Sequence, residues 1–283
     1  MNGRIGCLVV ALVSFVIVHG TVSAGEVDTT PLRLGCVGFS KDVTAKAFRE
    51  LGTYLESKVG SKVTVTVYPK YNEVIHDLVN EKIDMAMLSP LVYLNARSSC
   101  QVSTLGVGVY RATGDFAYRS IILAPKGAGI KSLSDLRGKS VAFVDLLSAS
   151  GFVVPKAAMV SAGVDVRGTF YGNHIDAVGA LVEGKADAAC TMSTIFDDSR
   201  EIAAHRGELD TVWTSEFVIP GDVFVATPSL SSSLSKKIEE ALLAYGSAQQ
   251  KGRAQQNALY KGFEPEQEKL FTGLEEFLNS FLD

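Results

Sequence analysis

One short stretch in the middle of the chain holds the residues that are best suited to bind an anion. Ser148, Ala149 and Ser150 are followed by glycine, and Pro155 comes soon after. Proline is tolerated only near the start of a helix, so a helix begins around residues 150–154. Free N–H groups, a partial positive charge and hydroxyls at such a terminus suit a phosphate-like anion. The plainer interpretation, equally open from this segment alone, is a serine that only caps the helix.

Four further side chains have the chemistry to complete such a site. His174 starts a predicted helix after a strand, and Asp222 follows a Pro-Gly turn just before another strand. Tyr71 opens a helix and Tyr118 opens a strand. Imidazole and phenol groups donate hydrogen bonds to an oxyanion, whereas a carboxylate accepts one from a protonated ligand oxygen or an amine. Each residue also has a structural interpretation: a helix-start histidine, a turn acid that caps its own backbone, or tyrosines that pack.

Enzymatic signatures are missing from the sequence. It contains no Walker loop, no GxSxG elbow, no HExxH and no nucleotide-type GxGxxG. His76, His174 and His205 do not have metal-ligand spacing. We therefore expect a binding protein without a cofactor or metal. The enzymatic alternative is a hydrolase of phosphorus esters that uses His174 and Asp222, but no activated nucleophile or metal set accompanies them.

The composition is that of a packed globular protein and excludes disorder. Of the 283 residues, 47% are hydrophobic and 20% are charged. The 27 Lys+Arg and 31 Asp+Glu give a formal net charge of −4, so no overall positive field exists to attract nucleic acid. The length allows one large domain or two lobes, because single cores stop growing at roughly 250–300 residues.

Residues 1–24 have the order of a secretory signal peptide. Arg4 is followed by the apolar run 5–18 and by small residues that end at Ala24. We expect cleavage after Ala24 and a mature chain without stable membrane insertion. An uncleaved anchor is the alternative, although the run is short for a span, which needs about 17–25 residues.

The cysteines of the predicted mature chain are scattered. Cys36, Cys100 and Cys190 form neither a disulfide framework nor a zinc site. At most one bridge is possible among them, and small buried apolar side chains are the favoured interpretation.

Apolar, β-branched runs alternate with helical patterns along the chain, which predicts parallel sheets covered by helices. The segments 74–86 and 174–189 share one order of helix, polar turn, acid and buried strand. Their presence in the two halves of the chain suggests two similar α/β lobes. The predicted strands are 32–38, 63–68, 83–88, 102–110, 118–124, 140–144, 168–171, 186–191, 211–214 and 223–226, and the predicted helices are 43–59, 72–80, 90–96, 152–162, 175–182, 195–205, 233–249 and 265–282.

Taken together, these segments resemble the periplasmic solute-binding proteins of phosphonate, phosphite and phosphate ABC transporters. Each marker is weak alone, but their order behind a signal peptide makes the resemblance specific, and it covers nearly all of the mature chain. The markers are Tyr71, the helix start 89–93, Tyr118 with Ser120, the segment 135–139, the loop 148–151, His174 and the turn 219–222.

The resemblance implies an α/β fold of the type II periplasmic binding protein class. Each of two lobes would be a sheet covered by helices, and two hinge strands would join the lobes, with the ligand in the cleft between them. The lobes would comprise residues 32–117 plus 224–283, and residues 118–223. The implied partners are a small phosphorus oxyanion and the permease and ATPase of an ABC transporter. The protein would work in the periplasm as a monomer.

The resemblance also implies the site. Asp222 would accept a hydrogen bond from a ligand O–H or amine, Ala149 would lie in the serine loop, and Tyr93 is a weaker candidate. The donors to the phosphonyl oxygens would be Tyr71, Tyr118, Ser148, Ser150 and His174.

Two departures from the family pattern bear on the ligand. Ala149 stands where the family often carries Thr, which removes one hydroxyl. Aminoalkylphosphonate binders carry a Glu in the region where this chain has residues 192–194, Met-Ser-Thr. We therefore expect phosphite, phosphate or a small alkylphosphonate rather than 2-aminoethylphosphonate. The alternative function is a ligand-sensing subunit of a membrane signalling receptor, which the sequence does not distinguish from transport.

Overall fold

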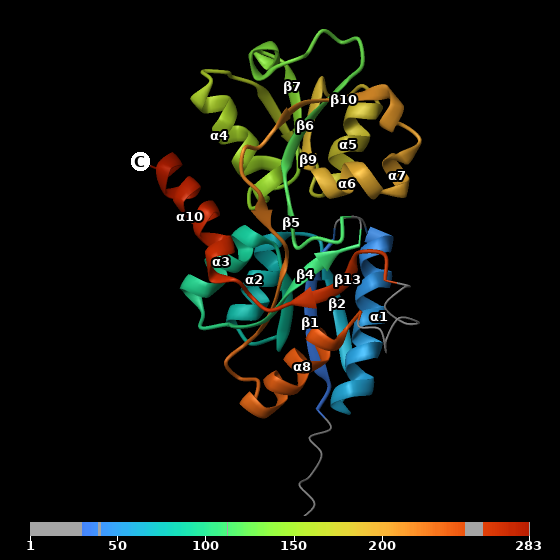
Figure 1. Cartoon of the computed structure of the whole chain (residues 1–283), viewed down its shortest axis with the longest axis vertical. Coiled ribbons are helices and arrows are strands. Elements are labelled where there is room, and N and C mark those ends of the chain that lie inside the picture. Colours follow the sequence, from blue (N-terminus) through green and yellow to red (C-terminus); the bar gives the residue numbers. More distant parts are fainter. Residues whose placement is uncertain (1–29, 39–40, 112, 247–256, 283) are drawn as a thin grey trace, which may run out of the picture.

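The computed structural model describes residues 30–38, 41–111, 113–246 and 257–282. The predicted signal segment 1–24 lies outside these residues. Within them, the chain forms two mixed sheets flanked by helices, and a two-stranded sheet connects the two bodies (Figure 1). We call these bodies the first lobe and the second lobe, in the order in which their sheets begin along the chain.

The sheet of the first lobe has the strand order β13-β4-β12-β3-β1-β2. β1, β2 and β3 are parallel, but β12 runs antiparallel to β3 and β4, and β13 runs antiparallel to β4. The expected parallel pairing is found for β1, β2 and β3 but not beyond β3, because β12 returns from the other lobe and enters the sheet from the opposite end. The bounds are β1 Leu32–Val37, β2 Val63–Tyr68, β3 Met85–Leu88, β4 Ser103–Tyr110, β12 Val223–Ala226 and β13 Tyr260–Glu264.

The sheet of the second lobe has the order β10-β6-β9-β7-β8. β7 is parallel to β8 and β9, whereas β6 runs antiparallel to β9 and β10. The orders β2-β1-β3-β12-β4 and β8-β7-β9-β6-β10 correspond strand by strand, which agrees with the expectation of two similar lobes. The bounds are β6 Ser120–Pro125, β7 Ser140–Phe143, β8 Arg167–Phe170, β9 Ala188–Met192 and β10 Leu209–Thr214.

Helices cover both sheets, and most begin close to where the apolar spacing predicts. The segment predicted as one helix over 195–205 is instead two, because the backbone is extended at Ser199. The Arg206 guanidinium donates to the carbonyl groups of Phe196 and Ser199 at this break. The bounds are α1 Lys41–Val59, α2 Tyr71–Val79, α3 Pro90–Ser99, α4 Val154–Ser161, α5 His174–Val182, α6 Ser193–Asp198, α7 Arg200–Ala203, α8 Ser232–Ala244 and α10 Glu268–Leu282, with shorter turns η1 Leu133–Leu136, η2 Ala149–Val153 and η3 Arg206–Glu208.

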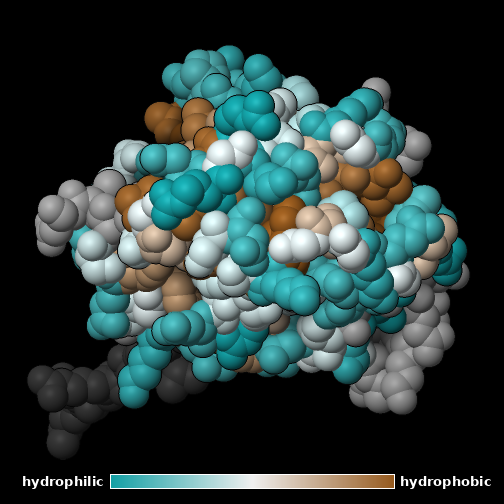
Figure 2. All heavy atoms as spheres, turned by 90° about the horizontal axis from the view of Figure 1, so that it is seen from above, coloured by the Kyte–Doolittle hydropathy of each residue, from teal (hydrophilic) through white to brown (hydrophobic). Residues whose placement is uncertain are grey.

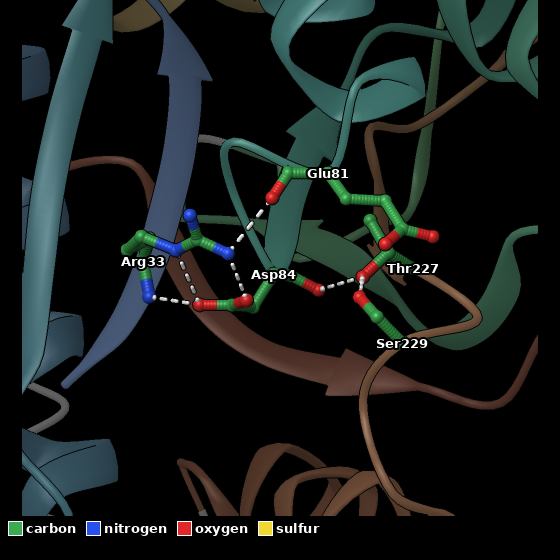
Figure 3. A network of polar contacts seen from close by, with 5 residues as sticks. All are labelled: Arg33, Glu81, Asp84, Thr227 and Ser229. Carbon is green, nitrogen blue, oxygen red and sulfur yellow. Dashed lines mark hydrogen bonds and ion pairs between the residues drawn. The ribbon is translucent and has the colours of Figure 1, made fainter. Parts of the chain in front are cut away.

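The repeated order of helix, turn, acid and strand builds the same contact in each lobe. Asp84 precedes β3 and accepts from the Arg33 amide of β1 at 2.7 Å and from its guanidinium at 2.6 and 3.0 Å (Figure 3). Asp187 precedes β9 and accepts from the amide and hydroxyl of Ser140 of β7 at 2.8 and 2.7 Å. Each acid thus fixes the register of two neighbouring parallel strands at their amino ends.

The lobes are joined by a pair of short antiparallel strands, β5 Ala117–Tyr118 and β11 Ile219–Pro220. Between β11 and β12, the Gly221 amide donates to the carbonyl of Phe116 at 2.6 Å. A Cβ at Gly221 would lie 2.7 Å from that oxygen, so the crossing has no room for a side chain. The C-terminal helix α10 packs against β11 and lies alongside α3 of the first lobe (Figure 1).

Cys36, Cys100 and Cys190 are unpaired thiols, and Cys36 and Cys190 are buried, as the apolar interpretation expects. Among the described residues, no helix combines the length and apolarity needed to cross a membrane. The end of the molecule at the second lobe is largely polar, with separate apolar patches (Figure 2).

Candidate ligand-binding site

The predicted site residues lie where parallel strands end. In the second lobe, η2 follows β7, α5 follows β8 and α6 follows β9. Because these strands are parallel neighbours, the segments that follow them meet at one edge of the sheet. In the first lobe, α2 follows β2 and α3 follows β3 in the same way. Tyr71 and His174, the first residues of α2 and α5, therefore occupy corresponding positions in the two lobes.

The serine loop is held tightly at its position. The Ser148 hydroxyl accepts from the Gly151 amide at 3.1 Å, and the Ser120 hydroxyl donates to the Ser150 carbonyl at 2.8 Å. A Cβ on Gly151 would lie 2.2 Å from a Val144 methyl group, so only glycine fits there. Ser148 is thus a capping residue, as the plainer interpretation holds, and the cap itself fixes the loop at the strand edge.

His174 is a buried, neutral side chain. The Asn173 side chain caps α5 by accepting from the Asp176 amide at 2.9 Å, which places His174 in the first turn. Its Nδ1 lies 3.0 Å from the Thr191 hydroxyl of β9. Burial lowers the pKa of His174 to about 3, so the ring is uncharged at neutral pH.

Asp222 is surrounded by tyrosines. The Tyr260 hydroxyl donates to Oδ2 of Asp222 at 2.7 Å. Burial raises the pKa of Asp222 to about 6. The hydroxyls of Tyr260 and, less strongly, Tyr110 lower this pKa but do not offset the effect of burial. Burial and the charge of Asp222 in turn raise the pKa of Tyr71 and of Tyr118. The structure therefore places three predicted residues, Tyr71, Tyr118 and Asp222, close enough to interact electrostatically.

Four buried hydroxyls at these strand ends make no well-formed hydrogen bond within the described residues, although those of Ser89, Ser150 and Tyr110 lie against Tyr71, Tyr118 and Asp222. They belong to Ser89, Ser150, Thr194 and Tyr110. Ser89 directly follows β3, Ser150 lies in η2, Thr194 is in the first turn of α6 and Tyr110 ends β4. A buried hydroxyl without a partner costs about 1–3 kcal/mol. Their gathering at strand ends is the arrangement expected of a site whose hydrogen bonds are completed by a polar ligand.

The second lobe closes over the site. Each of the seven predicted residues is at most 7% exposed. Leu147, in the loop after β7, packs against the first-lobe cluster that contains Tyr71 and Leu88. The charge of Asp145 in the same loop contributes to the raised pKa of Tyr71. Ala149 is buried in a cluster with Tyr118 and residues of both lobes.

Tyr93, the weaker candidate, is engaged elsewhere. Its hydroxyl donates to Glu266 at 2.7 Å and lies 3.0 Å from the Thr104 hydroxyl. Together with Arg97, these residues line a separate hollow in the first lobe.

Sequence reasoning missed four residues of this cluster. Ser89 opens the segment 89–93, which was a marker of the resemblance, but it was not among the predicted site residues. Thr194 follows the strand β9. Tyr110 and Tyr260 carry no such signal: Tyr260 lies on β13, which the sequence pattern did not predict as a strand.

The site can be compared with known proteins. A family model described as the periplasmic substrate-binding protein of phosphonate ABC transporters matches residues 38–271. The phosphate-import protein PhnD of Mycolicibacterium smegmatis is 29% identical over 238 residues, which are 78% of this chain and 73% of that protein.

Two solved structures share the fold. A binding protein component of an ABC phosphonate transporter from Pseudomonas aeruginosa matches with a TM-score of 0.79 and 19% identity, over 90% of this chain and 87% of that one. PhnD1 of Prochlorococcus marinus in complex with methylphosphonate matches with a TM-score of 0.77 and 17% identity, over 90% and 99%. The two similar lobes, their paired hinge strands and the extent of the family match together show that this chain belongs to the phosphonate-binding family of periplasmic substrate-binding proteins of ABC transporters.

Proposed function

We propose that this protein captures a small phosphorus oxyanion between its lobes and delivers it to the permease and ATPase of an ABC importer. The observation that carries the proposal is the set of buried, neutral hydrogen-bond donors gathered with one carboxylate at the strand ends. Such a set, enclosed and removed from water, is what a tetrahedral oxyanion with several acceptor oxygens requires.

The donors are Tyr71, Tyr118, Ser148, Ser150 and His174, and the loop at Ala149 supplies backbone N–H groups. Among the described residues, no lysine or arginine contributes to the pKa shifts of six groups of this cluster, which are Tyr71, Tyr110, Tyr118, Tyr260, His174 and Asp222. The anion is therefore held by dipoles and hydrogen bonds rather than by an opposing charge.

Asp222 gives the site its selectivity. An ionised carboxylate that is already bonded through Oδ2 accepts one further hydrogen bond from an O–H of the ligand. A ligand that carries no proton, such as sulfate, leaves this carboxylate facing an anionic oxygen without a hydrogen between them. We therefore expect selection of a protonated oxyanion.

The ligand we favour is phosphate, phosphite or a small alkylphosphonate rather than 2-aminoethylphosphonate. An ammonium group needs a carboxylate, and α6 begins with Ser193 and Thr194 at the end of β9, where no acid stands. Two relatives support this range: one is named a phosphate-import protein, and another was solved with methylphosphonate.

The proposal includes the architecture of delivery. The lobes comprise 32–117 plus 224–283 and 118–223, and the hinge lies near Tyr118 and Asp222. Residues 1–24 direct secretion to the periplasm, where the monomer meets the permease in its closed form.

Titration calorimetry of residues 25–283 tests the function. The panel is phosphate, phosphite, methylphosphonate and 2-aminoethylphosphonate, with sulfate as the unprotonated control. We expect tight binding of one of the first three and none of sulfate. Absence of binding to all the phosphorus compounds would refute the proposal. Preferential binding of 2-aminoethylphosphonate would refute the ligand assignment.

A further inference from the structure

We propose that Tyr260 is a positioning residue that holds Asp222 ready to accept a hydrogen bond from an O–H of the ligand, and that it thereby sets which protonation state of the ligand is bound. This inference rests on the proposed function of the site. It concerns a residue from the far C-terminal part of the chain, which the site residues predicted from the sequence do not include.

The geometry leaves the Tyr260 hydroxyl one role. It donates to Oδ2 of Asp222 at 2.7 Å, and the two residues are 1% and 4% exposed. The Tyr260 ring is enclosed by Phe48, Tyr110 and Phe263, with ring centroids 5.7 to 5.9 Å away. The hydroxyl therefore has no freedom to leave the carboxylate.

The backbone around both residues is fixed independently. The Asn257 side chain accepts from the Tyr260 amide at 2.9 Å and donates to the Ala47 carbonyl at 3.0 Å, which ties the start of β13 to α1. Asp222 is held from the hinge side, where its carbonyl accepts from the Gly108 amide at 2.9 Å. A Cβ at Gly108 would lie 2.7 Å from the Tyr260 ring, so the ring packs directly on the β4 backbone.

Within the part of the chain that the structure describes, the titratable groups that interact with Asp222 are phenols. They come from four elements: Tyr71 of α2, Tyr110 of β4, Tyr118 of β5 and Tyr260 of β13. Burial raises the pKa of each phenol, so all four stay neutral over the range in which Asp222 titrates. With no cation among them, the hydrogen bond from Tyr260 is the main interaction that favours the charged carboxylate.

Loss of this hydrogen bond has a defined chemical consequence. The carboxyl group would keep its proton to higher pH and would present an O–H donor where the native site presents an acceptor. The native site therefore favours a ligand form that carries an O–H group facing Asp222. The altered site favours the form of the same ligand that has lost this proton.

The test is the variant Tyr260→Phe, which removes the hydroxyl and keeps the ring. The matched control is Tyr54→Phe, which removes another buried tyrosine hydroxyl in the same lobe, bonded to the Ala241 carbonyl at 2.7 Å. Carboxyl NMR of the ligand-free protein, assigned with Asp222→Asn, gives the pKa of Asp222 directly. We expect Tyr260→Phe to raise that pKa by about one unit and Tyr54→Phe to leave it unchanged.

Calorimetry with phosphate from about pH 5 to pH 9 gives the functional half of the test. In Tyr260→Phe, the pH below which affinity declines should rise by the same amount as the pKa of Asp222. This rise should disappear when Asp222→Asn is also present. An unchanged Asp222 titration in a folded Tyr260→Phe protein, or an equal displacement on the Asn background, would overturn the inference. Failure of the native protein to bind any phosphorus oxyanion would instead refute the proposed function, whatever the titration shows.

Discussion

Asp222 is a residue at which the charged form serves ligand binding but lowers the stability of the folded protein. Its pKa in the folded protein is about 6, above the ordinary value near 4, so the folded state holds the proton more tightly. The free energy of unfolding therefore falls as the pH rises from about 4 to about 6, by about 3 kcal/mol in total.

The first prediction is that Asp222→Asn stabilises the ligand-free protein and weakens binding. Asparagine still accepts from Tyr260 but carries no charge to bury. Thermal melts at pH 8 should show a higher midpoint for the variant, and the gap should close toward pH 4. A native protein that is the more stable of the two at pH 8 would show that the buried charge is compensated in some other way.

His174 gives the second prediction at this scale. Its pKa is lowered to about 3, so its contribution to stability is present above the ordinary value near 6.5 and is lost as the pH falls through the acid range. His174→Ala should weaken ligand binding by about 1–3 kcal/mol, because a buried hydrogen-bonding group is lost. His205→Ala, at a partly exposed histidine bonded to Glu208, is the control in calorimetry and should bind as the native protein does.

Sequence patterns predicted individual site residues where a strand ends and a helix begins. Ser148, Tyr71 and His174 all follow that rule, and the structure places each of them at a strand end. Tyr260 escapes it, because it lies at the start of a strand and reaches Asp222 only through the pairing of β13 with β4. Contacts of this kind depend on tertiary pairing and have no local signature.

At the scale of elements, the η2 turn depends on a single glycine. A Cβ on Gly151 would meet Val144 at 2.2 Å and the Ser148 hydroxyl at 2.8 Å, and both are fixed by the strand and the cap. Gly151→Ala must therefore displace the loop that carries Ser148 and Ser150. We expect a loss of ligand affinity of at least tenfold and a lower melting temperature.

Gly179→Ala provides the comparison for this loop. Gly179 lies within α5 of the same lobe, and nothing approaches its Cβ position within 4 Å. Alanine there should leave binding unchanged and stabilise the protein by about 0.5–1 kcal/mol, from the gain in helix propensity. Native-like calorimetry from Gly151→Ala would contradict a role for the loop geometry in binding.

The elements themselves were largely predictable, and the exceptions have physical reasons. Apolar and β-branched runs located β1 to β4 and β6 to β10, although β8 and much of β10 are exposed in the structure. The sense of β12 was not readable, because strand direction depends on how the chain crosses between lobes. β13 was missed because its sequence, Tyr-Lys-Gly-Phe-Glu, has two apolar residues three positions apart, which does not fit the alternation of a strand.

At the scale of the whole molecule, Leu147 couples the lobes without belonging to the set of donors. It packs against the Tyr71 cluster of the opposite lobe, so it stabilises the closed arrangement. Leu147→Ala should weaken binding several-fold by favouring the open form, and small-angle scattering should show a larger radius of gyration at partial saturation. Leu146→Ala, at the neighbouring residue with 62% exposure, should change neither quantity. Equal effects from both variants would argue against closure through this loop.

The donors proposed for the site, among them the tyrosines and His174, are neutral at ordinary pH, which bears on how fast the protein captures its ligand. An approaching anion meets a protein whose formal charge is −4, so long-range electrostatics does not accelerate the encounter. Added salt should therefore leave the association rate constant unchanged or raise it slightly, the reverse of a cationic trap, and the affinity should persist in brine. Under the proposed function, retention of the anion then depends on slow dissociation from the closed site rather than on attraction between opposite charges.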